Sequence, residues 1–451
     1  MANSKSRADR IISRQVSRCT IDAAHLSAIG VDVHRDLLVC CFQTLDAKAG
    51  VLTSHHRDFG TTLSELSKFA EWCRDCAPSV VLMESTGVLW FSVYRSLEDV
   101  GFTTDSLAVV NARDVKAAAG RKTDAQDAAR LAEYARLGKF SKSFVPSRPF
   151  RDMRMISRAI CKLSDDISRQ KNRYNKALNS VGCRATSVFS DVNGKAARAI
   201  LNAYIQDDPD LERIVKSSSK RLRATPEEIL NAIEFAMAPE IRVLLRVLLD
   251  HLDYLIHARE VLLAQLREMQ APYENCIQRL MTIPGVKESS ARILFSEVTN
   301  EVDAFPDAAH FASWLGLCPG NNKSAGKSSS GKTPKGNRWA RKILTEVAQG
   351  IGLMKSGALR ELYQSFKERR GQRRAIIATA HKVAVIIFAI IRDGSIYVDM
   401  PRTVLRDTHV ARYIRWMRNL REHGWVMTPD GTIVDKNTGE LIVQPRVPIA
   451  A

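Results

Sequence analysis

Two long heptad patterns constrain the fold of this chain more than any other feature. They cover residues 153–181 and 241–269, and in each the apolar side chains recur in alternating steps of three and four. This spacing lays one apolar stripe along a long helix and favours the packing of two such helices. Ala271 and Pro272 end the second helix. We therefore predict a long antiparallel coiled-coil arm over residues 149–272, acting as a helical spacer or as a dimerisation element.

A further helix start lies between the two heptad patterns. A polar stretch at residues 185–222 is followed by Thr225-Pro226-Glu227-Glu228. Proline suits the first helical position, and threonine with glutamate three residues later forms a capping box. The sequence therefore predicts that a helix begins at this point.

The chain before residue 149 has the pattern of an α/β domain. Apolar runs and helical spacings alternate in the order strand, strand, strand, helix, strand, helix, strand, helix, over residues 27–33, 37–42, 51–57, 63–73, 79–83, 86–97, 105–110 and 123–137. The first three strands predict an antiparallel meander, and the order as a whole predicts a mixed sheet flanked by helices, as in a ribonuclease-H-like domain at residues 26–148. Residues 1–25 are polar, basic and aperiodic, which predicts a flexible arm.

Four acidic residues occupy unusual places in this domain. Asp32 lies inside an apolar strand, where a charge is costly unless it is paired or bound to a metal. Glu84 follows the apolar run 80–83, at the carboxyl end of a strand, where sites in such sheets collect. Asp124 and Asp127 are three residues apart, so both project from one face of a helix that Thr123 can cap.

The four acids together favour a metal site. By itself the pair on the helix fits a solvated first turn that complements the positive helix N-terminus. Two acids from strands and two from one helix face can instead hold two hard cations, Mg²⁺ or Mn²⁺, and such pairs suit phosphodiester cleavage. His34 could also be a ligand, although we expect an ordinary turn histidine.

A basic segment from Gly316 to Leu344 has no acid at all. Its glycines and serines let a backbone approach closely, and its cations can neutralise phosphates. A flexible basic linker is the alternative, but the flanks 311–315 and 339–347 have the pattern of ordered helices. The candidate nucleic-acid contacts in this segment are Lys323, Lys327, Lys332, Lys335, Arg338, Arg341 and Lys342.

Two neighbouring segments support nucleic-acid binding. Residues 280–287 resemble the turn of a helix–hairpin–helix motif, in which a glycine-containing turn presents N–H groups to a phosphate, and they end at Lys287. Residues 367–374 form a second basic patch, and residues 375–391 predict a buried helix. Beyond residue 400 the clearest signal is a hairpin turn at 429–431.

The overall composition agrees with a polyanionic partner. Among 451 residues, 67 Lys and Arg outweigh 49 Asp and Glu, giving a formal net charge of +18. Such an excess indicates nucleic acid first and an anionic membrane surface second. No run of 18 or more apolar residues occurs, and the basic N-terminus lacks the apolar core of a secretory signal. Nine scattered cysteines fit a reducing interior, and Cys73 with Cys76 is interpreted as part of a helix rather than a zinc site. We expect a cytoplasmic protein with no membrane partner.

The ordered set of motifs resembles a known family, the DEDD transposases of insertion sequences, over residues 27–145 and 275–395. Members join a RuvC-like domain to a mostly α-helical C-terminal transposase domain and are guided by a bridge RNA. The pieces that carry the resemblance are Gly30-Val31-Asp32, Glu84-Ser85-Thr86-Gly87, residues 122–128, Ile283-Pro284-Gly285-Val286, and residues 314–337 from Trp314-Leu315-Gly316 through Ser324 to Lys335-Gly336-Asn337.

The resemblance implies roles for single residues. It makes Asp32, Glu84, Asp124 and Asp127 a tetrad that binds Mg²⁺ or Mn²⁺. It makes Ser324 the nucleophile that attacks a DNA phosphate and forms a covalent phosphoserine link. Ala325 departs from the glycine that commonly follows this serine, and residues 328–330 offer three alternative hydroxyls.

The resemblance also implies partners and domain limits. The partners are target and donor double-stranded DNA, a noncoding guide RNA, and further copies of the chain in a dimer or tetramer. Ser324 would act on a site in its own chain or in a partner's. The transposase domain would cover residues 273–398, and a C-terminal tail would cover 399–451.

Other functions stay open at this point. A RuvC-like junction resolvase would use the same acids with water as nucleophile, and a non-enzymatic nucleic-acid-binding scaffold would use neither the acids nor Ser324. Gly30-Val31-Asp32 also resembles the phosphate-binding start of sugar-kinase folds. The chain has no second glycine-rich phosphate loop to support that reading.

Overall fold

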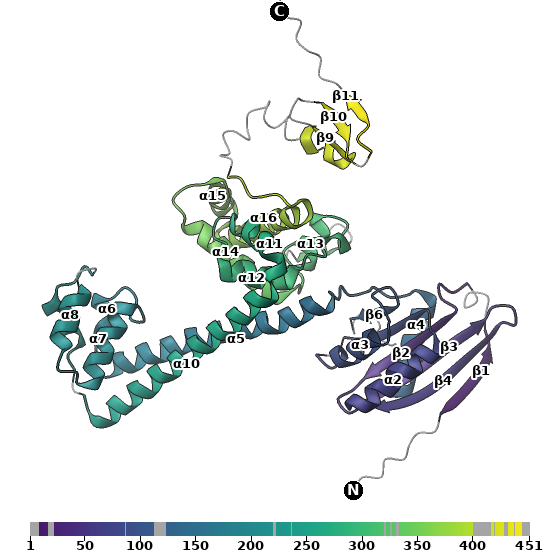
Figure 1. The fold of residues 1–451 in the computed structure, drawn as a ribbon, viewed down its shortest axis with the longest axis horizontal. Coiled ribbons are helices and arrows are strands. Elements are labelled where there is room, and N and C mark those ends of the chain that lie inside the picture. Colours follow the sequence, from purple (N-terminus) through teal and green to yellow (C-terminus); the bar gives the residue numbers. More distant parts are fainter. Residues whose placement is uncertain are drawn as a thin grey trace, which may run out of the picture. The chain divides into compact units, whose positions relative to one another are not determined.

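The computed structural model of the chain describes residues 9–16, 22–85, 87–111, 123–219, 222–235, 237–319, 322–324, 327–330, 333–399, 416–418, 420–427, 432–436 and 438–443. It divides into two compact units, Met1–Arg148 and Pro149–Ala451. Figure 1 labels the helices and strands of both. The finer domain limits drawn from the sequence stay predictions.

The first unit is built on one mixed β-sheet, whose strands lie in the order β1-β4-β3-β2-β5-β6. β2, β3 and β4 are antiparallel neighbours, which confirms the predicted meander, and β5 and β6 run parallel to β2. The strands are β1 (Arg10–Gln15), β2 (Ser27–Val33), β3 (Leu37–Asp46), β4 (Val51–Gly60), β5 (Val80–Glu84) and β6 (Leu107–Val110).

Helices cover both faces of this sheet (Figure 1). On one face, α2 (Leu63–Cys76) and α3 (Trp90–Asp99) pack on the strands through a core that includes Phe69 and Leu97. On the other face, α4 (Asp124–Leu137) packs through Leu131 and its alanines. Both faces of the central strands are therefore buried. The mixed α/β architecture predicted for this part of the chain is confirmed.

The prediction of a flexible arm over residues 1–25 is wrong for residues 10–15. These residues form β1, which pairs antiparallel with β4 from Arg10 opposite His56 to Gln15 opposite Val51. Every side chain of β1 is exposed, so the strand has no apolar alternation that a sequence pattern could reveal. Its backbone instead forms hydrogen bonds with β4, whose N–H and C=O groups would otherwise be unpaired at the edge of the sheet.

Two long helices begin the second unit. α5 (Arg148–Ser180) and α10 (Pro239–Met269) pack side by side through Ile167, Leu252 and Leu255 (Figure 1). Gln170 is a polar residue within the first heptad pattern, and its amide Nε2 donates to the carbonyl of Leu248 at 2.9 Å. Two long packed helices are therefore present. Their supercoiling as a coiled coil stays a prediction.

Four short helices cap the end of this helix pair. They are α6 (Ala185–Val188), α7 (Lys195–Gln206), α8 (Leu211–Ser219) and α9 (Pro226–Ile233). They share a core with α5 and α10 that includes Tyr174, Ile200 and Leu245. The predicted capping box is confirmed, because Glu228 N donates to Thr225 Oγ1 at 3.2 Å and Thr225 N donates to Glu228 Oε2 at 2.8 Å.

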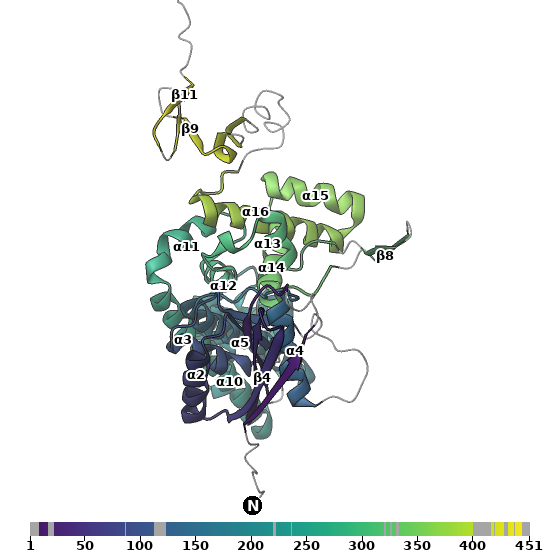
Figure 2. The ribbon, with the colours of Figure 1, turned by 90° about the vertical axis from the view of Figure 1, so that its right-hand side faces the viewer.

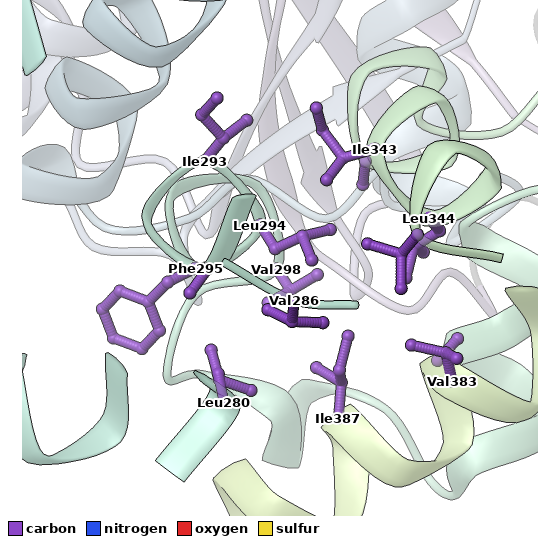
Figure 3. Close-up of a cluster of buried hydrophobic side chains, with 14 of the residues drawn as sticks. Leu280, Val286, Ile293, Leu294, Phe295, Val298, Ile343, Leu344, Val383 and Ile387 are labelled. Carbon is purple, nitrogen blue, oxygen red and sulfur yellow. The ribbon is translucent and has the colours of Figure 1, made fainter. Parts of the chain in front are cut away.

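The rest of the second unit is a helical domain with one large core. Its helices are α11 (Glu274–Met281), α12 (Glu288–Val298), α13 (Ala308–Trp314), α14 (Arg338–Leu353), α15 (Ala358–Arg370) and α16 (Gln372–Asp393), joined by the short turns η1 (Ala271–Tyr273) and η2 (Val302–Ala304). Figure 3 shows side chains from α11, α12, α14 and α16 meeting in this core, among them Leu280, Leu294, Leu344 and Ile387.

α16 is a long, apolar helix. Among the described helices it is the one whose length and composition would let it cross a membrane. Its side chains Val383, Ala384 and Ile387 are buried in the helical core, as predicted for this stretch. It is the core helix of the domain.

Three short strands lie near the C-terminus, namely β9 (Trp425–Met427), β10 (Ile433–Asp435) and β11 (Leu441–Val443). β9 and β10 pair antiparallel. The predicted hairpin turn at 429–431 between them lies outside the described residues.

Candidate metal centre and serine hairpin

A glycine lets α4 lie directly on β2. A Cβ added at Gly30 would sit 2.2 Å from the carbonyl oxygen of Ala128 and 2.3 Å from the amide nitrogen of Ala132, so no other residue fits there. Asp32 is two residues further along the strand and therefore lies on the same face. The backbone contact at Gly30 thus brings the first turn of α4, with Asp124, over the end of β2.

Asp32, His34 and Asp124 form one group. His34 Nε2 lies 3.2 Å from Asp32 Oδ2 and 3.9 Å from Asp124 Oδ2. Their ligand atoms all lie within 4.8 Å of one another, close enough to hold a metal ion. His34 does stand in the turn after β2, where its N–H donates to the carbonyl of Leu37. Its side chain nevertheless joins the acids, which fits the ligand role that the sequence left open for it rather than the ordinary turn histidine that we expected.

Asp32 is the most constrained acid of the group. Only 17% of its side chain is exposed. Burial raises its pKa above the ordinary value, His34 opposes that rise, and the neighbouring charges of Asp127, Asp124 and Glu84 add to it. The other three predicted acids are therefore close enough to Asp32 to raise its pKa. A carboxylate in this environment is unfavourable without a cation.

Glu84 and Asp127 flank this group from two different elements. β5 runs parallel beside β2 with Val31 opposite Met83, so Glu84 ends its strand next to Asp32. Asp127 Oδ1 forms an ion pair of 2.7 Å with Arg130 Nη2. The sequence thus identified four acids that the fold does gather where β2 and β5 end and α4 begins.

Thr123 stands at the N-cap of α4, but its side chain makes no capping hydrogen bond. Its carbonyl oxygen accepts from the N–H groups of Gln126 and Asp127 instead, at 2.9 and 3.0 Å. The predicted helix start is correct, while the predicted side-chain cap is not. Lys122, part of the same motif, lies outside the described residues.

A cavity of about 580 Å³ opens beside the first turn of α4. Arg10 and Ile12 of β1, His56 and Arg57 of β4, and Gln126 of α4 line it. The edge strand that was not predicted therefore contributes one wall of this cavity. Arg10 and Arg57 supply positive charge to this cavity, beside the first turn of α4, which also carries Asp124.

Ser324 lies in the second unit, in a short antiparallel hairpin. The hairpin consists of β7 (Asn322–Ser324) and β8 (Lys327–Ser330), with Ser324 opposite Lys327. Figure 2 shows β8 extending away from α14 and α15. Ser324 ends β7 at the turn, whereas the alternative hydroxyls at 328–330 lie on β8. Residues 325, 326, 331 and 332, including Lys332, lie outside the described residues.

The basic residues after the hairpin have different surroundings. Lys335 and Arg338 are exposed, and the Arg338 guanidinium lies 4.6 Å from the centre of the Trp339 ring. Arg341 Nη1 donates to the carbonyl of Pro334 at 3.3 Å. Lys342 forms an ion pair with Asp165 of α5, so part of its charge is used inside the fold.

The predicted turn between α11 and α12 is present. Gly285 has φ +83°, a conformation that favours glycine, and Val286 behind it is buried. Lys287 follows as the exposed N-cap of α12. The turn therefore has the form expected of a helix–hairpin–helix. A phosphate contact there stays a prediction.

Two family models match this chain. Residues 29–182 match a DEDD transposase model of the IS110 type, and residues 277–364 match a model described as transposase of the IS116/IS110/IS902 family. The first covers the sheet domain from β2 onward, with its acids, and the whole of α5. The second covers α12, the serine hairpin and α14.

Several bacterial proteins are similar. A probable family 20 transposase of Pseudomonas aeruginosa is 26% identical over 337 residues, which cover 72% of this chain and 88% of that protein. An insertion element IS110 protein of 43.6 kDa from Streptomyces coelicolor is 31% identical over 122 residues, and a putative transposase of Sinorhizobium fredii is 29% identical over 129 residues. These two matches cover 26% and 28% of this chain, and only 29% and 33% of the respective relatives.

Proposed function

The chain belongs to the DEDD transposases of the IS110 family, and from this premise we propose that it cuts and rejoins DNA through a covalent phosphoserine intermediate. The metal tetrad of this proposal is Asp32, Glu84, Asp124 and Asp127, and its nucleophile is Ser324. The observation that carries it is the gathering of the acids around the nearly buried Asp32, whose pKa is raised.

The donor set fits a hard divalent cation. The four acids offer oxygen ligands, which Mg²⁺ and Mn²⁺ prefer, and His34 adds a nitrogen ligand that Mn²⁺ also accepts. The repulsion that raises the pKa of Asp32 is the kind that a cation relieves. A divalent ion bound there would polarise a phosphodiester and stabilise the charge that develops on it.

The chain's own residues would then carry the reaction as follows. The hydroxyl oxygen of Ser324 forms a bond to phosphorus, the bond from phosphorus to one deoxyribose oxygen breaks, and the released strand takes up the proton as a free hydroxyl. Attack of another strand's hydroxyl on the phosphoserine reverses these changes and joins the new partners. Lys335 and Arg338, both exposed, would neutralise phosphates near the hairpin.

Charge supports nucleic acids as partners. The net charge of +18 and the arginine-lined cavity beside α4 suit a phosphodiester backbone. We assign target and donor double-stranded DNA as substrates and a noncoding RNA as the guide that pairs with both. We further assign a homo-oligomer, dimer or tetramer, in the bacterial cytoplasm.

The nucleophile is tested by Ser324→Ala. We expect this variant to bind DNA as the wild type does and to form no covalent protein–DNA adduct when trapped with denaturant and resolved on a gel. Ser328→Ala on β8 is the matched control and should still form adducts. Adducts that persist in Ser324→Ala would contradict the assignment.

A second candidate function is a RuvC-like nuclease that hydrolyses junctions with water. It is favoured by the fact that the first unit gathers its acids without any residue of the second. It predicts cleaved ends that carry no protein and full activity in Ser324→Ala. A non-enzymatic binding scaffold would instead cut no DNA in the wild type, and Asp124→Asn would leave its nucleic-acid binding unchanged.

The guide is tested by sequencing the RNA that co-purifies with the full chain. We expect one discrete noncoding species with segments complementary to target and donor DNA. Bulk ribosomal and transfer RNA alone would contradict guided recombination and would reflect only the basic surface.

A further inference from the structure

We propose that the buried Glu297 and the partly buried Asn337 form a clamp that fixes the base of the serine hairpin, and that both are positioning residues for the chemistry of Ser324. The inference rests on the proposed function, because it explains how the assigned nucleophile is held. It concerns residues of α12 and α14 that lie outside the acidic tetrad and the basic surface.

Glu297 is a fully buried carboxylate in the helical domain. Its Oε1 accepts from Arg158 Nε at 2.7 Å, and its Oε2 accepts from Arg158 Nη2 at 2.9 Å. Arg154 Nε lies 3.6 Å from the same carboxylate. Burial lowers the pKa of Arg154 to about 10, so its guanidinium still carries its charge at neutral pH. The carboxylate of Glu297 is therefore paired with two arginines of α5.

Asn337 connects this buried charge to the hairpin. Its Nδ2 donates to Glu297 Oε2 at 2.8 Å. Its Oδ1 accepts from the N–H groups of Trp339 and Ala340, at 3.1 and 3.2 Å, and so caps α14. Its own backbone N–H donates to the carbonyl of Trp314 at 3.2 Å. Asn337 thus joins α12 and the start of α14 through its side chain, and the end of α13 through its backbone.

The two ends of the segment that carries the hairpin touch each other beside this clamp. A Cβ added at Gly336 would sit 2.2 Å from the amide nitrogen of Gly316, and a Cβ added at Gly316 would sit 2.6 Å from the amide nitrogen of Gly336. Gly316 also has φ +74°. The chain therefore leaves and re-enters the helical core at one point, with the hairpin between residues 316 and 336.

Simple packing does not require this arrangement. A buried ion pair commonly stabilises a fold no better than apolar side chains of the same size would. The Glu297 carboxylate does something that apolar side chains could not do. As a hydrogen-bond acceptor it fixes both the distance and the orientation of the Asn337 side chain. Trp314 and Trp339 flank the two arginines, with ring centres 5.9 Å from Arg154 and 6.0 Å from Arg158. A rigid base is what a hydroxyl nucleophile on a projecting hairpin needs, since a misplacement of about 1 Å can cost about 10²-fold in rate.

The clamp is tested by Asn337→Ser in the full chain. Serine retains the cap of α14 but is too short to donate to Glu297. We expect the rate of covalent adduct formation with saturating DNA to fall by about 10- to 100-fold. DNA affinity and the thermal unfolding midpoint should stay close to those of the wild type. Asn337→Asp, which also retains the cap but repels Glu297, should show the same loss and serves as the test if Asn337→Ser does not fold.

The matched control is Asp307→Ser at the N-cap of α13, whose side chain accepts from His310 N at 2.8 Å. It changes a cap in the same domain without touching Glu297. The clamp would be overturned if both Asn337 variants formed adducts at the wild-type rate. It would also be overturned if Asp307→Ser lowered the rate of adduct formation as much as the Asn337 variants do.

Ser324→Ala is assayed in parallel to separate the two proposals. If it still forms adducts, the proposed nucleophile is wrong whatever the clamp variants do. If it forms none while the Asn337 variants react normally, the nucleophile stands and the positioning role fails.

Discussion

At the scale of single residues, Asp32 belongs to a strand that is part of the core and also supplies a candidate metal ligand. Its neighbours in β2 are buried apolar side chains, and its own side chain faces α4 and three other acids. Burial and like charges make its ionised form unfavourable in the metal-free protein. The same arrangement makes a divalent cation a strong stabiliser, since a ligand that binds only the folded state stabilises it by mass action.

We therefore predict opposite effects of Asp32→Asn with and without metal. In chelator the variant should unfold a few degrees above the wild type, because one repelling charge is gone. With Mg²⁺ or Mn²⁺ at 100 times the dissociation constant, the wild type should gain about 2.7 kcal/mol and the variant little. Differential scanning fluorimetry with and without cation measures both. Asp36→Asn in the neighbouring turn, where Asp36 pairs with Arg35 in solvent, is the control and should respond to cation like the wild type.

Gly30 carries the second prediction at this scale. Gly30→Ala should destabilise the first unit by about 3 kcal/mol, because its Cβ would overlap the backbone of α4. It should also abolish stabilisation by Mg²⁺, since α4 carries Asp124. Chemical denaturation with and without cation measures both effects. Gly350→Ala in α14, where a Cβ meets nothing within 4 Å, should leave stability equal or slightly higher. A cation response preserved in Gly30→Ala would show that the contact does not position the acids.

At the scale of elements, an ion-pair network joins α10 to α12. Glu288 Oε1 accepts from Arg267 Nε at 2.7 Å and from Arg292 Nε at 2.9 Å. Hydrogen bonds from Arg267 and then Arg292 lower the pKa of Glu288 to about 2. This network fixes the long helix to the helix that follows the Gly285 turn.

The network gives a pH-dependent prediction for Glu288→Gln. A lowered pKa means that the ionised form stabilises the fold above the ordinary value of 4.5, and that this stabilisation disappears as the pH falls toward about 2. At pH 7 the variant should be less stable by about 1 kcal/mol, a modest figure because the side chain is 38% exposed. Urea unfolding at pH 7, 5 and 3 should show the difference narrowing as the pH falls. Glu212→Gln, at the exposed pair with Lys216, should show almost no difference at any pH.

At the scale of the whole molecule, the chain separates into two units with their own cores. The first unit ends at Arg148 and contains all four predicted acids together with His34. A unit of the length of residues 1–148 can bury enough apolar surface to fold by itself. The second unit carries the hairpin with Ser324 and the clamp.

We predict that residues 1–148 fold alone and respond to cation. The isolated unit should unfold cooperatively and should be stabilised by Mn²⁺ and Mg²⁺, as measured by circular dichroism melts. It should form no covalent adduct with DNA because Ser324 is absent. Asp32→Asn in the same fragment is the control and should remove the cation effect. A fragment that folds without any cation response would place the metal ligands elsewhere.

Local patterns in the sequence predicted much of this molecule correctly. The three-stranded meander, α4, the two long helices, the capping box at Thr225 and the buried α16 all follow from periodicity and capping residues, which act between near neighbours in the chain. The acids could be identified for a similar reason. A charge inside an apolar strand and a pair on one helical turn are visible before any fold is known.

Other features depended on contacts between distant residues. β1 forms because the edge of β4 is open, and its exposed side chains follow no pattern. His34 joins the acids because α4 crosses β2 at Gly30, a contact between positions almost a hundred residues apart. The clamp joins Arg158, Glu297 and Asn337 from three helices.

The sequence by itself thus determined the elements and the chemical groups that they carry, because secondary structure and amphipathic faces arise from interactions along the chain. Only the tertiary structure decided which groups meet. A buried charge or a glycine has an effect set by the atoms packed around it, and those atoms come from distant parts of the chain. The acids, with His34 as a possible further ligand, were therefore predictable as candidates, whereas the meeting of His34 with them and the Glu297–Asn337 clamp required the folded molecule.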